Sequence, residues 1–288
     1  MLKIGTRGSA LALAQARTVA EQIPDSELVV VESSGSPVED KARWTRALDE
    51  ALVAGEVDIA LHSAKDVPAV RPDGVVPVAV PKRVDPRDSI CGAGSLAVLA
   101  EGTTVGTASP RRSALLKALR PDLEVIELRG NVDTRLRKLD AGECDAIILA
   151  AAGLERLRLS ERGNPLDPDD FTPAAGQGCL LLEALATNDE AGAAASAVND
   201  PESATALKAE RALVIALDAD CHTAVGAMAT VSEGEIEMSA VVLAPDGSSA
   251  LRAMVTSTEA AETVGRNLAK QLLDSGADRL LALARGES

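Results

Sequence analysis

The feature that most constrains the fold is an alternation of short apolar stretches with longer amphipathic ones over the first two-thirds of the chain. In order, it predicts a strand at 2–6, a helix at 9–23, a strand at 27–33, a helix at 39–55 and a strand at 57–63. Ser9 suits the N-cap of the first helix, and Gly55 suits the end of the second. Strands that alternate with helices predict a parallel sheet covered by helices.

A proline-rich stretch at 76–94 interrupts this rhythm and predicts a crossover to a second lobe. The pattern then resumes with a strand start at 103–109, a helix at 109–122, a strand at 123–130, a helix at 131–142 and strands at 144–153 and 176–185. Ser109 is the expected N-cap of the first of these helices, because Pro110 suits the first helical position.

The last third follows a different pattern. Residues 200–217 predict a helix, and three strands follow at 224–231, 235–244 and 250–257, separated by the turn sequences "SEGE" and "PDGS". Such spacing predicts an antiparallel meander. Thr256 and Glu259 form a capping-box pattern for a closing helix through Leu273.

Composition excludes several classes of function. The formal net charge is −15 and aromatic residues make up 1% of the chain, which disfavours nucleic acid and anionic membranes as partners. Four dispersed cysteines and two histidines make a zinc site improbable, and no metal is expected. The N-terminus does not resemble a signal peptide and the longest apolar run is too short to cross a bilayer, so we expect a cytoplasmic protein with free thiols.

Cationic residues follow several of the predicted strands, at the edge where parallel sheets bind ligands. Eight Lys or Arg residues but four Asp or Glu residues lie between Thr107 and Lys138. The arginines that follow strands are Arg7, Arg111, Arg112, Arg129 and Arg135. Because a guanidinium group suits a carboxylate, this set predicts a site for several carboxylates at once.

Arg111 and Arg112 stand in the first turn of a predicted helix, where the helix dipole disfavours positive charge. That placement indicates an anion-binding helix terminus. Asp66 is the lone carboxylate among these strand ends; it is either a turn residue or a charge partner for a cation that develops during a reaction. His62 suits a hydrogen-bonded strand end better than a base, and Lys65 is either an anion contact or a salt-bridge partner.

The cysteines divide into two groups. Cys91, Cys144 and Cys179 lie in apolar surroundings and are predicted to be small buried hydrophobes. Cys221 lies in the polar segment "LDADCHTA", where a thiolate can be alkylated.

Several long segments resemble the hydroxymethylbilane synthase family, also called porphobilinogen deaminase. They are "TRGSALALAQA", "VDIALHSAKDVP", "DPRDSI", "GTASPRRSALLKALRPDLEVIELRGNVDTRLRKLDAGECDAIILAAAGLERL", "GQG" and "ERALVIALDADC". The resemblance implies a transferase that condenses four porphobilinogen units head to tail, releases ammonia at each step and hydrolyses the product to linear 1-hydroxymethylbilane. It also implies a dipyrromethane cofactor on a thioether to Cys221.

The resemblance also implies roles for single residues. Asp66 would be the catalytic residue, which stabilises the cationic pyrrole formed as ammonia leaves. The positions that match cofactor contacts are Lys65, Ser109, Arg111, Arg112 and Arg135. The positions that match substrate contacts are Arg7, Ser9, Ser63, Arg129, Gln177 and Gly178. The sequence departs from the family after the cysteine, where Thr223-Ala224 replaces a common Val-Pro pair.

The implied fold is α/β: two lobes with mainly parallel sheets that resemble periplasmic binding proteins, hinged around a cleft, and a small α+β domain with a three-stranded antiparallel sheet. The expected domains are 1–82 with 177–197, 83–176, and 198–288, the last carrying the cofactor. The family implies a monomer whose partner is the small molecule porphobilinogen, without nucleic acid or membrane.

The residues alone leave two other functions to be distinguished. A pure binding protein could close two lobes on a dicarboxylate, but Asp66 and Cys221 would then have no role. A non-catalytic relative could serve as an interaction protein, which the presence of both residues disfavours. The mass of the intact protein distinguishes these readings, because only the enzyme carries two linked pyrrole units.

Overall fold

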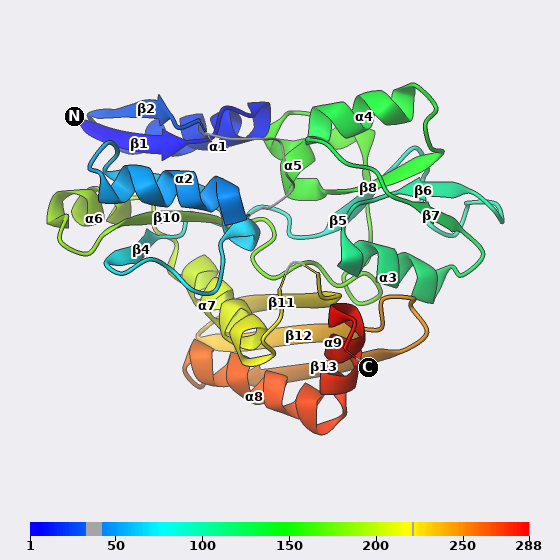
Figure 1. The fold of residues 1–288 in the computed structure, drawn as a ribbon. Helices are drawn as coiled ribbons and strands as arrows, with labels where there is room; N and C mark the ends of the chain where they lie inside the picture. The colour runs from blue at the N-terminus through cyan, green and yellow to red at the C-terminus, as the bar shows by residue number, and fades with distance from the viewer. Residues whose placement is uncertain (33–41, 221, 288) are drawn as a thin grey trace. The chain divides into compact units, whose positions relative to one another are not determined.

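The computed structural model describes residues 1–32, 42–220 and 222–287. The chain divides into two compact units, Met1–Val84 with Gly178–Ala204, and Asp85–Gln177 with Thr205–Ser288. Figure 1 labels the helices and strands of both units. The first unit contains one five-stranded sheet, and the second contains a five-stranded and a three-stranded sheet. The division into three domains stays a prediction beside these two units.

The sheet of the first unit has the strand order β2-β1-β3-β10-β4. In that order the strands are Ser26–Val30, Leu2–Thr6, Ile59–Ser63, Leu180–Leu185 and Val75–Ala79. The pairs β1–β2 and β1–β3 are parallel, whereas β10 is antiparallel to both β3 and β4. One strand therefore runs against the other four, which confirms a mainly parallel sheet.

Helices cover both faces of this sheet because successive side chains of a strand point to opposite faces. Ile59 and Leu61 of β3 pack under α1 (Ala10–Ala20) and α6 (Asp189–Ser196). Ala60, between them, packs on the other face under α2 (Ala42–Val53). The start of the helix predicted from residue 39 lies outside the described residues.

The five-stranded sheet of the second unit has the order β7-β6-β8-β5-β9 and repeats this plan. In that order the strands are Glu124–Ile126, Thr104–Gly106, Ala146–Ala150, Asp88–Cys91 and Asn164–Pro165. Here β5 is the strand that runs antiparallel to its neighbours. Helix α3 (Pro110–Leu119) covers one face, and α4 (Val132–Asp140) and α5 (Ala151–Arg156) cover the other.

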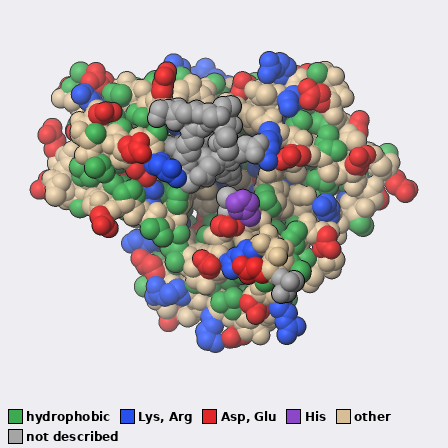
Figure 2. Space-filling view, in the orientation of Figure 1, with side chains coloured by type: hydrophobic (Ala, Val, Ile, Leu, Met, Phe, Trp, Pro, Cys, Tyr) green, Lys and Arg blue, Asp and Glu red, His purple; other side chains and the backbone are tan. Residues whose placement is uncertain are grey.

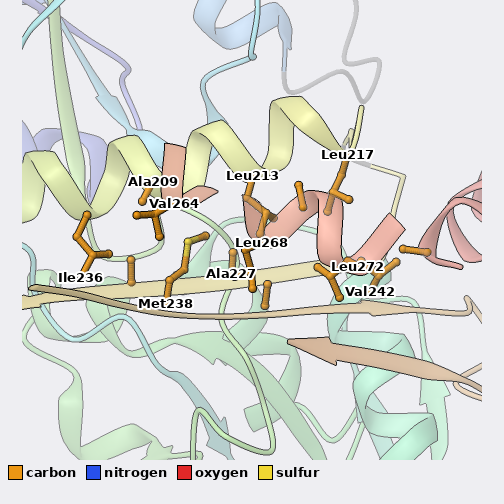
Figure 3. Close-up of a cluster of buried hydrophobic side chains, with 14 of the residues drawn as sticks. Ala209, Leu213, Leu217, Ala227, Ile236, Met238, Val242, Val264, Leu268 and Leu272 are labelled. Carbon is orange, nitrogen blue, oxygen red and sulfur yellow. The ribbon is translucent and has the colours of Figure 1, made fainter. Parts of the chain in front are cut away.

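The last sheet is the predicted antiparallel meander, formed by β11 (Val225–Ser232), β12 (Glu235–Leu243) and β13 (Ala250–Ser257). Two helices, α7 (Pro201–Ala216) and α8 (Ala261–Asp274), pack on it through an apolar core (Figure 3). A further helix, α9 (Ala277–Arg285), contributes Leu280 and Leu281 to the same core. The predicted fold class is thereby confirmed.

Helices α7 and α8 approach each other closely at one glycine. A Cβ atom added to Gly265 of α8 would lie 2.1 Å from the carbonyl oxygen of Ala209 in α7. Such a distance is far inside van der Waals contact, so the approach of the two helices depends on the missing side chain.

Several local predictions can be compared with this fold. Ser9 and Ser109 do cap their helices, since their Oγ atoms accept hydrogen bonds from the backbone N–H of Ala12 and Arg112. The capping box is wrong: Thr256 lies in β13 opposite Glu237, and α8 begins at Ala261 without a side-chain cap. The stretch 76–94 is not only a crossover, because it contains most of β4 and all of β5.

Charged side chains of both signs are spread over the surface (Figure 2). On the face drawn in Figure 2, acidic and basic side chains are interspersed and hydrophobic ones are scattered between them. Among the described residues, no helix combines the length and hydropathy that a membrane span requires.

Candidate functional site

In the first unit, a small pocket opens where β1 and β3 end. The two strands are adjacent and parallel, so the residues that follow them meet at the same edge of the sheet. The pocket is lined by Arg7, Ala12, Gln15, Thr45, Leu61, His62, Ser63 and Asp66. Three residues predicted from strand ends, Arg7, Ser63 and Asp66, are thus brought together.

Asp66 ends a single 3-10 turn, Ala64–Asp66, directly after β3, and its side chain is half-buried. Burial lowers the pKa of the Arg7 guanidinium, and the negative charge of Asp66 opposes that effect. Asp66 and Arg7 are therefore charge partners within the pocket. This pairing places an anion and a cation side by side at the end of a buried strand.

Hydroxyl and amide groups complete the pocket wall. The Nε2 atom of Gln15 donates a hydrogen bond to Oγ of Ser63 over 3.1 Å. Gln15 is buried, and sequence reasoning missed it because it lies inside the apolar face of α1. Ser9 is half-buried at the N-cap of that helix, and the side chain of Lys65 is exposed.

His62 is buried beside this pocket. Burial, together with the positive charges of Arg71 and Arg7, lowers the pKa of His62 to about 3. Its Nε2 atom lies 3.3 Å from Oε2 of Glu183 in β10. His62 is therefore a neutral strand-end residue at neutral pH.

In the second unit, the predicted arginines of α3 surround an acid that the sequence analysis overlooked. Asp88, at the start of β5, is fully buried. Its carboxylate lies 2.7 Å from Nη1 of Arg111 and 2.6 Å from Nη2 of Arg112. Nε2 of Gln177 also donates to this carboxylate over 3.0 Å. The two arginines are thus buried and held, rather than extended from an open helix terminus.

The charges explain how Asp88 stays ionised. Burial alone would raise the pKa of this carboxyl group, but the adjacent Arg111 and Arg112 guanidiniums outweigh it and hold the pKa well below its usual range. Two guanidiniums against one carboxylate leave one excess positive charge in the cluster. Ser109 caps α3 immediately before these arginines.

Arg135 adds to this excess. Burial, and then the positive charges of Arg112 and Arg129, lower the pKa of Arg135 to about 10. Its Nε atom is buried and meets no hydrogen-bond partner among the described residues. Arg129 is more exposed, and its Nη2 atom lies 2.6 Å from Oε1 of Glu127. The cluster of Arg111, Arg112, Arg129 and Arg135 therefore fits an anionic ligand.

The glycine that follows Gln177 has a conformational role. Gly178 has a φ of 89°, a left-handed conformation that favours glycine. Gln177 itself is buried, and its amide also donates to the carbonyl of Pro86 over 2.7 Å.

Cys221 lies outside the described residues. Next to it in sequence, the Asp220 carboxylate accepts hydrogen bonds from the backbone N–H groups of His222 and Thr223. The other three cysteines are buried and not in disulfides, as predicted. Burial raises the pKa of the Cys91 thiol to about 11, which makes it a poor nucleophile.

The fold and these charges define an α/β protein with arginine-rich strand ends and an antiparallel C-terminal sheet. Two family models match the chain: "porphobilinogen deaminase, dipyromethane cofactor binding domain" over residues 2–193, and "porphobilinogen deaminase, C-terminal domain" over residues 204–274. The chain belongs to the porphobilinogen deaminase family.

Similar proteins span the full length. A porphobilinogen deaminase of Thermus thermophilus is 44% identical and covers 98% of both chains. One of Rubrobacter xylanophilus is 42% identical, over 99% of this chain and 98% of its own. Among solved structures, a periplasmic substrate-binding protein of an ABC transporter from Coxiella burnetii is 16% identical with a TM-score of 0.44, covering 70% of this chain and 93% of its own.

Proposed function

We propose that this chain is a hydroxymethylbilane synthase. It joins four porphobilinogen molecules head to tail, releases ammonia at each step and hydrolyses the product to linear 1-hydroxymethylbilane. Family membership over nearly the whole length supports this activity. The single structural observation that supports this activity is the excess of guanidinium groups around Asp88 and Arg135.

That excess fits the dipyrromethane cofactor of the family. Each porphobilinogen unit contributes one pyrrole ring with two carboxylate side chains. The buried Nε of Arg135 needs a hydrogen-bond acceptor that the described residues do not supply. The residues that would hold the cofactor are Lys65, Ser109, Arg111, Arg112 and Arg135, with Cys221 as the thioether sulfur. When bound, the cofactor supplies the pyrrole carbon to which the first substrate is joined.

Asp66 is the proposed catalytic residue. Its carboxylate accepts the hydrogen bond of a substrate pyrrole N–H and stabilises the positive charge that develops on the ring as ammonia leaves. Arg7 is its charge partner in the pocket at the end of β3. The residues proposed to bind the substrate are Arg7, Ser9, Ser63, Arg129, Gln177 and Gly178.

Further properties belong to this proposal. The chain would act as a cytoplasmic monomer whose partner is porphobilinogen. The net charge of −15 supports a protein that does not bind nucleic acid.

The mass of the intact purified protein tests the proposal. We expect the wild type to exceed its sequence mass by two linked pyrrole units, and Cys221→Ser to lack this excess. Cys179→Ser is the matched control, because Cys179 is buried in the first unit and should leave the excess unchanged. A wild type without added mass, which releases no ammonia from porphobilinogen, would instead support the pure binding protein.

A further inference from the structure

A buried ion network lies next to the pocket of the first unit, and the proposed reaction gives it no role. The guanidinium of Arg71 donates to both oxygens of Glu183 over 2.8 and 2.6 Å. It also donates to both oxygens of Asp49 over 3.2 and 2.5 Å. The side chains of Arg71, Asp49 and Glu183 are only 11%, 9% and 0% exposed. Paired forks of this kind fix the direction of the arginine side chain.

The network anchors the segment that follows the turn of Asp66. At its start, the turn is attached to β10, because Ser63 pairs with Leu180 and the N–H of Ala64 donates to the carbonyl of Cys179. Five residues after Asp66, the guanidinium fork of Arg71 reaches Glu183, which lies farther along the same strand. Both ends of the segment that contains Asp66 are therefore fixed to β10.

Charge makes this attachment specific to a guanidinium. Glu183 is fully buried, and burial raises the pKa of Asp49 while the hydrogen bond and the charge of Arg71 oppose that rise. Asp49, His62 and Glu183 also lie close enough to hold a metal ion, with ligand atoms within 4.8 Å of one another. The hydrogen bonds of Arg71 already satisfy the carboxylates of Asp49 and Glu183, so the Arg71 guanidinium takes the place that a metal ion would occupy.

We propose that Arg71 is a positioning residue for the reaction proposed above: by tying the segment that follows the Asp66 turn to β10 and α2, it holds the Asp66 carboxylate in place. This inference rests on the proposed function. Arg71 itself does not contact substrate; it acts through Asp66.

His62 provides a readout that is independent of activity. The charged groups around it are Glu183 of β10, Asp49 of α2, Arg71, Asp66 and Arg7. Burial lowers the pKa of His62 most, and the charge of Arg71 lowers it further. Without Arg71, the carboxylate of Glu183 at 3.3 Å favours the protonated imidazole, so the pKa of His62 should rise.

The test compares Arg71→Met and Arg71→Lys with the wild type. The matched control is Arg162→Met, which removes a more exposed ion pair with Asp140. We expect all variants to carry the cofactor mass. In Arg71→Met, kcat should fall by about 10- to 100-fold with little change in KM, because a misplaced catalytic group lowers rate rather than binding. Arg71→Lys should lie between, and Arg162→Met should match the wild type.

Nuclear magnetic resonance of the imidazole groups gives the second measurement. The chain has two histidines, so His222→Gln assigns the remaining signal to His62. In the wild type this signal should not shift between about pH 5 and 8, and in Arg71→Met it should shift across that range.

Each outcome decides the inference. Undiminished kcat in Arg71→Met overturns it, whatever the imidazole signal does. If circular dichroism shows that the folded fraction of Arg71→Met decreases by the same factor as kcat, the inference is also overturned, because Arg71 would then be merely structural. If Arg71→Met does not fold, Arg71→Lys with wild-type kcat overturns it. A wild type that makes no bilane refutes the proposed function instead, which separates the two failures.

Discussion

Replacing Asp88 with Asn tests the charge arrangement of the arginine cluster. Asn keeps the shape of the side chain and one oxygen acceptor but removes the negative charge. Arg111 and Arg112, only 4% and 6% exposed, would then be buried without a counter-charge. Breaking a buried ion pair by removing one partner typically costs about 3–5 kcal/mol. At about 2–4 °C for each kcal/mol, the Tm should fall on the order of 6–20 °C.

Differential scanning calorimetry measures this loss, after the intact mass shows that both proteins carry the same cofactor load. Asp274→Asn is the control, since Asp274 forms an exposed ion pair with Lys270 and such pairs contribute little. A Tm within about 2 °C of the wild type for Asp88→Asn would refute the reasoning. In that case the two guanidiniums would be satisfied by backbone carbonyls and solvent rather than by the carboxylate.

The remaining predictions follow from single features. Asp66→Asn should retain the cofactor mass but lose about 10²- to 10³-fold in kcat, because an amide cannot offset a cationic pyrrole; near-normal turnover would remove Asp66 from its role. Arg135→Ala should reduce cofactor loading or chain elongation while leaving the Tm nearly unchanged, and a simple loss of Tm would point to a structural role. The free-energy advantage of the wild type over Asp88→Asn should be full above about pH 4 and decline as pH falls toward the depressed pKa of Asp88, as urea unfolding at several pH values can show. Gly265→Ala should lower stability by at least about 1–3 kcal/mol by urea unfolding, because its methyl group would meet the Ala209 carbonyl.

The fold was largely predictable because its strands and helices have strong periodicity. The strand and helix that precede Asp66, and the meander after α7, follow directly from apolar spacing. The sequence predicts a crossover where β4 and β5 lie, because proline and charged residues interrupt their apolar pattern. Helix α9 was missed since no cap other than Gly276 precedes it.

The candidate site was less predictable where partners are distant in sequence. Arginines after strands pointed to an anion site, but the same pattern could not show that Arg111 and Arg112 already share a carboxylate. Asp88 lies 24 residues before Arg112, inside a segment that reads as polar. Its burial is decided by tertiary packing, so only the motif "DPRDSI", which resembles the family, could have indicated it. Gln15 and Arg71 were missed for the same reason.

The place of β10 in the first sheet has a consequence for protein synthesis. This strand lies between β3 and β4, yet it is made about a hundred residues after them. As the ribosome extends the chain, β3 and β4 therefore lack the strand that separates them in the finished sheet. Until residue 185 has been made, β3 and β4 each present an unpaired strand edge that can pair with other molecules.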